Sequence, residues 1–267
     1  MSNLKQIIAI SALGIALILG LAAYTVFKTP AAASGPIAAI PLAESATESS
    51  TRTTPSQSSP SATAIANATT TGAQPTAIPA ASGATTQAAD SVVFQIVPEE
   101  SKARFIIDEV LDNQPKTVVG TTDQVAGEIA LDPQDPTQTR VGTIQVNART
   151  LTTDSEFRNR AIKNQILRTD QYEFITFTPT EISGLPQSGA VGEPYSFQIA
   201  GDLTIGDVTR PVTFDVTTSA ATETRLEGTA TTTIAYADYG ISIPQVRQVA
   251  SVAEQVRLEL DFVAVTA

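Results

Sequence analysis

Three unlike patterns of hydrophobic and polar residues follow one another along the chain. Residues 6–27 are apolar and uncharged and are bracketed by Lys5 and Lys28. The next stretch consists mostly of Ser, Thr, Ala, Pro and Gly and has no aromatic side chain. From Ser91 onward, apolar and polar residues alternate in short runs that turn-forming residues separate. The patterns divide the chain into three regions: 1–28, 29–90 and 91–267.

The first region is long enough for a membrane-spanning helix. At about 1.5 Å per residue, residues 6–27 would extend roughly 33 Å, against a hydrocarbon core of about 30 Å. A cleaved secretory signal has a shorter apolar core of about 7–15 residues, followed by small residues such as Ala31-Ala32-Ala33. Length favours an uncleaved single-pass anchor in the cell membrane. Both interpretations place the rest of the chain outside the cytoplasm if the N-terminus stays inside, and the protein would be secreted if the segment is cleaved.

The second region, 29–90, is predicted to be a disordered linker. Its composition cannot bury enough apolar surface to offset the conformational entropy of the chain. Its prolines favour an extended tether. We expect a spacer that holds the following domain away from the bilayer.

The third region, 91–267, alternates with a period of two, which is typical of strands with one buried face. The clearest run is Val256, Leu258, Leu260, Phe262 and Ala264, which alternates with polar or smaller residues. Turn-forming clusters such as Asp112-Asn113 and Gly206-Asp207 separate the runs. About eight such strands predict an all-β domain, either an antiparallel sandwich or a closed barrel. The other alternating sets are Phe94/Ile96, Ala103/Phe105/Ile107, Ile144/Val146, Phe174–Phe177, Phe197/Ile199, Val212/Phe214/Val216 and Ile234/Tyr236.

One segment departs from the strand pattern. Thr153-Asp154-Ser155-Glu156 fits a capping box with Thr153 as the N-cap. A short helix is predicted from there to about Leu167, with Phe157, Ala161, Ile162 and Ile166 near one face.

Composition narrows the chemistry. The chain has no His, Cys or Trp and a net charge of −11. Residues 1–90 carry equal numbers of basic and acidic side chains, so the acidic excess belongs to 91–267. These counts exclude disulfides, Cys/His metal sites and nucleophile–histidine triads, and they argue against nucleic acid as a partner. No cofactor, metal or catalytic residue is predicted, and Asp108/Glu109 and Glu99/Glu100 are assigned to turns.

Several blocks of 91–267 stand in the order and spacing of a known family: Phe94-Gln95-Ile96-Val97-Pro98, Ser101-Lys102-Ala103-Arg104-Phe105, Val118-Val119-Gly120, Gly127-Glu128-Ile129, Leu151-Thr152-Thr153 to Arg158-Asn159, Tyr172 to Phe177, Gly201-Asp202-Leu203-Thr204-Ile205 to Val212, and Asp238-Tyr239-Gly240-Ile241. Through them the domain resembles the YceI-like family of bacterial polyisoprenoid-binding proteins. The family usually has Asp where Asn159 stands and Pro where Glu173 stands. The resemblance implies an extended, lipocalin-like, eight-stranded antiparallel barrel with one short inserted helix. It also implies a long isoprenoid-type lipid, a quinone or a polyprenyl compound, as the ligand.

Apolar residues of the strands and the helix would line such a ligand site. A barrel interior can equally be filled by its own side chains, and the domain would then be a structural or protein-interaction module without a ligand. An enzyme acting on an amphiphile is the third hypothesis. Arg158 and Arg160 could meet a head group or simply face solvent, and Tyr236 and Tyr239 could present hydroxyls at the mouth or serve packing. The predicted apolar lining is Phe105, Ile107, Ile144, Val146, Phe157, Ile162, Ile166, Phe177, Phe197, Ile199, Phe214, Val216, Tyr236, Leu258 and Leu260.

Overall fold

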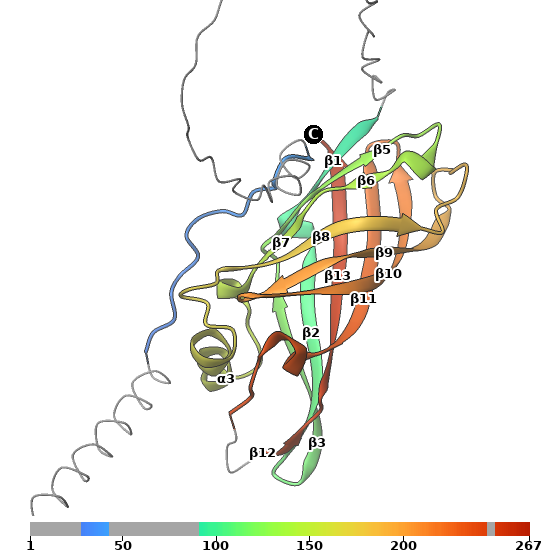
Figure 1. Ribbon diagram of the computed structural model, residues 1–267. Coiled ribbons are helices and arrows are strands. Elements are labelled where there is room, and N and C mark those ends of the chain that lie inside the picture. Colours follow the sequence, from blue (N-terminus) through green and yellow to red (C-terminus); the bar gives the residue numbers. More distant parts are fainter. Residues whose placement is uncertain (1–27, 43–90, 245–248) are drawn as a thin grey trace, which may run out of the picture.

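The computed structural model describes residues 28–42, 91–244 and 249–267 (Figure 1). The anchor predicted for 1–28 lies outside these residues except for Lys28, and so does the linker from 43 to 90. Within the described ranges, no helix is both long and apolar enough to cross a membrane.

The domain is all-β, a curled antiparallel sheet with one short helix. Its longest strands lie in the C-terminal half, where two-residue turns such as Gly206-Asp207 connect them. The strands are β1 (Val92–Ile96), β2 (Lys102–Leu111), β3 (Gln114–Thr122), β4 (Val125–Ala126), β5 (Glu128–Leu131), β6 (Arg140–Val141), β7 (Ile144–Asn147), β8 (Phe174–Ser183), β9 (Pro194–Ile205), β10 (Val208–Thr222), β11 (Arg225–Ala235), β12 (Val249–Val252) and β13 (Gln255–Thr266). Short helical turns interrupt them at η1 (Pro98–Glu100), η2 (Pro136–Gln138), η3 (Ala148–Thr150) and η5 (Tyr236–Tyr239).

The strand order brings the two ends of the sheet together. Hydrogen bonding runs β4-β7-β8-β9-β10-β11-β13-β1-β5-β6, and β2 pairs with β13, β3 and β12. The end strand β4 precedes β5 with only Gly127 between them, and the other end strand, β6, leads into β7 across Gly142 and Thr143. The Gly142 N–H also donates to the Glu128 carbonyl at 2.8 Å. The sheet therefore curls back toward itself, and Figure 1 shows its strands wrapped around one long axis.

The turns that connect the strands use the backbone conformations that their residues allow. Asp112 and Asn113 have φ of 49° and 61°, and they join Leu111 to its cross-strand partner Gln114. Asn and Asp adopt positive φ more readily than other non-glycine residues, and this geometry fits the right-handed twist of a hairpin. Gly206, with φ of 65°, serves the same purpose between β9 and β10. Both predicted turns are confirmed.

The helix begins two residues later than predicted. α3 spans Glu156–Ala161 and continues as the wider turn η4 (Ile162–Ile166). Its N-cap is Ser155, whose side chain accepts a hydrogen bond from the Arg158 N–H, so the expectation for Thr153 was wrong. The reason is Asn159, whose side-chain oxygen accepts from the Thr153 N–H at 2.7 Å and from the Thr153 hydroxyl at 2.8 Å. These bonds hold Thr153 outside the helix.

Residues 28–42, which are Lys28 and the first part of the linker predicted to be disordered, lie against the domain as an extended segment that we call the strap. Ser34 donates its backbone N–H and its hydroxyl to the two carboxylate oxygens of Glu173, at 2.8 and 2.7 Å. The Leu42 N–H donates to Glu128 at 3.0 Å. The structure therefore differs from the expectation of disorder for this part of the linker. Its backbone forms hydrogen bonds with side chains that lie far away in the sequence, and the composition of the linker does not reveal these partners.

Candidate functional site

An apolar cavity of about 1570 Å³ runs through the inside of the curled sheet. Pockets for drug-sized ligands usually measure about 300–1,000 Å³, so this cavity suits a longer molecule. Strand residues form its wall, and α3 and η4 border it at one end. The loop between β8 and β9 borders it at the other end with Leu185 and Val191, together with Tyr195 at the start of β9. The cavity therefore extends from one end of the sheet to the other.

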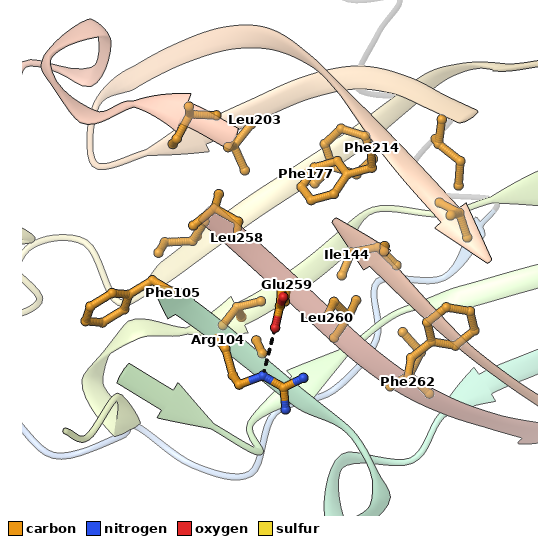
Figure 2. A pocket seen from close by; sticks show the side chains of 18 of the residues that line it. Arg104, Phe105, Ile144, Phe177, Leu203, Phe214, Leu258, Glu259, Leu260 and Phe262 are labelled. Carbon is orange, nitrogen blue, oxygen red and sulfur yellow. Dashed lines mark hydrogen bonds and ion pairs between the residues drawn. The ribbon is translucent and has the colours of Figure 1, made fainter. Parts of the chain in front are cut away.

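The alternation seen in the sequence decides which side chains face this cavity. On β13, Leu258 and Leu260 line it, and on β10 Phe214 does so beside Phe177 of β8 (Figure 2). The two rings meet edge to face, with centroids 4.9 Å apart and planes at 65°. The structure brings the whole predicted apolar lining together, although contact with a ligand stays a prediction. Those lining residues are Phe105, Ile107, Ile144, Val146, Phe157, Ile162, Ile166, Phe177, Phe197, Ile199, Phe214, Val216, Tyr236, Leu258 and Leu260.

Three of the lining phenylalanines lie over glycines. A Cβ added to Gly120 would stand 2.0 Å from the Phe105 ring, which comes from the residue directly opposite on β2. Phe262 covers Gly228 in the same way, 2.7 Å from its virtual Cβ, and Phe177 covers Gly201, also at 2.7 Å. A glycine leaves room for an aromatic ring to lie along the sheet. These rings therefore lie against the wall and take up less of the interior.

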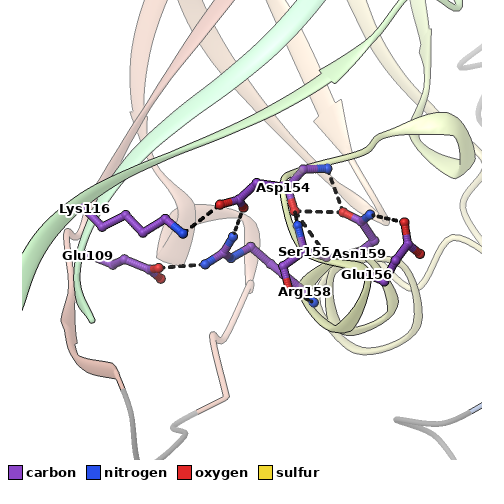
Figure 3. Close-up of polar contacts among 8 residues, drawn as sticks. Glu109, Lys116, Asp154, Ser155, Glu156, Arg158 and Asn159 are labelled. Carbon is purple, nitrogen blue, oxygen red and sulfur yellow. Dashed lines mark hydrogen bonds and ion pairs between the residues drawn. The ribbon is translucent and has the colours of Figure 1, made fainter. Parts of the chain in front are cut away.

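The α3 end of the cavity carries a network of four linked charges (Figure 3). Arg158 on α3 donates to Glu109 on β2 at 2.8 Å and also bonds Asp154. Lys116 on β3 extends the network with a 2.7 Å bond to Asp154. The bond from Lys116, with a further contribution from the charge of Arg158, lowers the pKa of Asp154 despite some desolvation. The two cations and two anions of this network balance each other.

Glu109 corrects the sequence interpretation. Asp108 and Glu109 belong to β2 and not to a turn, and Glu109 borders the cavity with a side chain only 8% exposed. It continues the inward alternation of Phe105 and Ile107, which was the signal available in the sequence. A charged residue at an inward position is paired when it is buried, and Arg158 supplies the partner. Glu99 and Glu100 lie in the helical turn η1.

Other polar side chains lie at or near the cavity. Arg104 and Glu259 border it from β2 and β13 and bond each other at 3.2 Å (Figure 2). Tyr236 lines the cavity, whereas Tyr239 is buried beside it in the core. Burial raises the pKa of Tyr239 to about 12. Its hydroxyl has no hydrogen-bond partner among the described residues.

No metal centre is formed by the described part of the chain. Within 28–42, 91–244 and 249–267, no three His, Cys, Asp or Glu side chains come together as ligands for an ion. The site is therefore an apolar interior bordered by ion pairs such as Glu109 with Arg158 and Arg104 with Glu259.

Known proteins share this architecture. The model of a family described as the YceI-like domain matches residues 94–264. The crystal structure of BcnA from Burkholderia cenocepacia superimposes with a TM-score of 0.50 at 17% identity, covering 63% of this chain and 98% of that one. A polyisoprenoid binding domain from Saccharophagus degradans, implicated in plant cell wall breakdown, gives 0.50 at 13% identity, covering 66% and 99%. No curated protein matches the chain significantly.

Proposed function

Because the chain belongs to the YceI-like domain family, we propose that it binds a long lipid of isoprenoid type, a quinone or a polyprenyl compound, inside its curled sheet. At the level of the family, a polyisoprenoid-binding domain supports this ligand class. The single observation that carries the proposal for this chain is the apolar cavity of about 1570 Å³. A filled interior, which the alternative of a purely structural domain requires, would leave no such space.

The sheet serves this purpose as a closed, lipocalin-like barrel of eight antiparallel strands. Its units would be β1 with β2, β3 to β5, β6 with β7, β8, β9, β10, β11, and β12 with β13. The pairings β5·β1 and β4·β7, on opposite sides of the same unit, support closure. A barrel of eight strands is wide enough to hold one small ligand.

Binding in this cavity would rest on shape and apolar contact. Burying apolar surface is worth about 25 cal/mol per Å², so a long hydrocarbon chain gains affinity along its whole length. Several of the bordering charges are engaged with each other, as Glu109 is with Arg158 and Arg104 with Glu259. These ion pairs do not oppose the entry of an apolar tail. The protein we propose is a binding protein and not an enzyme, in keeping with its membership of the YceI-like domain family.

The proposal includes a membrane location. The uncharged residues 6–27 would anchor the chain and leave the barrel outside the cytoplasm, or would release it by cleavage after Ala33. A ligand of this class is itself confined to membranes by its insolubility. An anchored barrel would therefore work beside the reservoir of its ligand.

The test is extraction of lipid from the full-length protein. We expect the protein, purified in mild detergent, to release an organic-soluble isoprenoid that mass spectrometry identifies. Leu258→Trp should block the cavity and abolish the lipid, while the neighbouring Arg257→Trp, at a side chain that is 54% exposed, should retain it. Leu258→Phe should reduce the lipid with a smaller risk to folding, which circular dichroism checks. Native mass spectra that repeatedly show only the bare polypeptide would overturn the proposal.

A further inference from the structure

We propose that the strap, residues 28–42, docks the barrel with the α3 end of its cavity at the surface of the membrane that residues 6–27 enter, so that the cavity loads directly from the bilayer. The lipid cargo in this inference rests on the proposed function. The membrane anchor also belongs to that proposal, whereas the contacts of the strap with the domain do not depend on it.

The centre of the strap is held by a partly buried carboxylate. Both oxygens of Glu173 accept from Ser34, and the same side chain accepts from Asn147 at 2.9 Å and from Arg149 at 2.7 Å. Desolvation acts to raise the pKa of Glu173, but the bonds from Ser34 and Asn147 and the charge of Arg149 outweigh it and keep the pKa lowered. Arg149 also donates to the Ala32 carbonyl at 3.2 Å. Hydrogen bonds to a charged acceptor are stronger than neutral ones, so this contact is specific.

The C-terminal end of the strap is held by an apolar contact and a second carboxylate. The Leu42 side chain lies over Gly142, 3.3 Å from the position that a Cβ would occupy. The Leu42 N–H donates to one oxygen of Glu128, and the Gln95 side chain donates to the other oxygen at 3.1 Å. The strap is therefore fixed at two places, which sets its direction along the domain.

The N-terminal end of the strap lies beside the helical end of the cavity. The Lys28 carbonyl accepts from Asn164 of η4 at 2.7 Å, and the Lys28 ammonium bonds Asp170 at 3.3 Å. Lys28 directly follows the apolar residues 6–27. If that stretch crosses the bilayer, Lys28 stands at the interface and holds η4 there.

An exposed aromatic residue belongs to the same end. Phe157 on α3 borders the cavity and is 54% exposed. Val191, in the loop after β8, borders the other end and is 56% exposed. The 10 residues of β8 separate the two ends by about 33 Å at 3.3 Å per residue. The strap thus selects which of two exposed apolar rims faces the bilayer. Without it, a flexible linker of 29–90 would average about 45 Å end to end and would allow either orientation.

The first measurement asks whether the strap docks in solution. The chain has no cysteine, so the pair Leu42→Cys and Gly142→Cys can form only the engineered disulfide. The Leu42 Cγ lies 3.4 Å from the Cβ position at residue 142, which is close enough for a bridge. We expect near-complete oxidation in the full-length protein. Failure to oxidise under conditions that preserve the fold would overturn the docking.

The second measurement asks which end faces the bilayer. The full-length chain, carrying a single fluorophore at Phe157→Cys or at Val191→Cys, is placed in phosphatidylcholine liposomes that contain a quencher-labelled lipid. We expect quenching to be several-fold stronger at 157 than at 191. The strap variant Ser34→Pro/Leu42→Ala should bring the two close to equality without touching the barrel wall. Gly35→Ala is the matched control, since its Cβ would meet nothing within 4 Å and the difference should persist.

Equal quenching with an intact strap, or an unchanged difference in the release variant, would refute the inference, and so would an intact mass that shows cleavage after Ala33. Neither measurement requires a ligand. Uptake of decaprenyl ubiquinone from the same liposomes is scored separately. If quenching at 157 dominates but no quinone is extracted, the proposed function fails and the docking stands. If quinone is taken up with equal quenching at both ends, the proposed function stands and the inference fails.

Discussion

Replacing Gly120 with alanine tests whether glycines keep the cavity open. The new methyl group would stand 2.0–2.8 Å from atoms of the Phe105 ring, and no backbone atom is among its nearest neighbours. The ring can therefore move, and the free direction is the cavity. A phenyl ring fills about 150 Å³ of a tight cavity, roughly a tenth of the 1570 Å³ available. We expect the variant to fold with a locally narrowed interior.

Replacement by alanine should destabilise the protein less at Gly120 than at Gly201 or Gly228. Overpacking costs about 1–3 kcal/mol, and replacing a strand glycine by alanine returns about 0.5–1 kcal/mol, so Gly120→Ala should lower the free energy of unfolding by about 1–2 kcal/mol. At Gly201 and Gly228 the methyl group would also meet carbonyl oxygens, those of Thr178 at 2.5 Å and Thr217 at 2.7 Å. A backbone carbonyl cannot turn aside as a ring can. Alanine at either position should cost about 3 kcal/mol or more.

Urea denaturation followed by circular dichroism gives these stabilities, and lipid extraction from the same preparations gives the occupancy. The expected result for Gly120→Ala is a modest loss of stability with a clear loss of bound isoprenoid. The reasoning would be refuted if Gly120→Ala proved as destabilising as Gly201→Ala, or if it retained all of its lipid. The first outcome would mean that the Phe105 ring is locked in place, and the second that the ring does not enter the space that the ligand uses.

Three further predictions concern charges and buried hydroxyls. Arg158→Ala leaves the nearly buried Glu109 without its partner and should lower the free energy of unfolding, measured in urea, by about 3 kcal/mol. Lys116→Ala removes a more exposed ion pair and should lower it by less than about 1 kcal/mol. Equal losses would contradict the ion-pair network. The pKa values of Asp154 and Glu173 are lower in the folded protein than in the unfolded chain. The stability that these carboxylates add is therefore complete above their unfolded-state pKa values and should fall as the pH drops below about 4. A urea midpoint that stays constant down to about pH 2 would contradict this. Burial raises the pKa of Tyr239 to about 12, so the free energy of unfolding should decline as the pH rises from about 10 toward that value. Tyr239→Phe should remove this decline and add about 1 kcal/mol to the free energy of unfolding at neutral pH. A loss of stability in this variant would instead reveal a partner for the hydroxyl.

The sequence was sufficient to predict which face of each strand points inward, but not whether the space between those faces is empty. Alternation places Phe214, Leu258 and Leu260 inside because neighbouring side chains of a strand point to opposite sides of the sheet. Whether they meet in the middle depends on curvature and on cross-strand register. Phe105 lies over Gly120 only because β2 and β3 pair in one register. The hollow interior could therefore be recognised only in the structure.

Polar contacts outside the local pattern were the other limit. Asn159, six residues after Thr153, moves the start of α3 by binding it, and the capping pattern does not include that competition. The strap was interpreted from its composition as disordered, and its order depends on Glu173 and Glu128, which lie far along the chain. In both cases a residue outside the pattern that was used for the prediction overrides a local preference.

The attachments of the strap change what the linker connects. Leu42 bonds one oxygen of Glu128 and Gln95 of β1 bonds the other, so the chain leaves the barrel and re-enters it at a single side chain. Residues 42 and 91 both belong to parts of the chain that lie on this domain, so the length of 43–90 does not set the distance between the barrel and Lys28. We expect a protease that cuts between them to divide the polypeptide while the contacts of the strap still hold its two parts together.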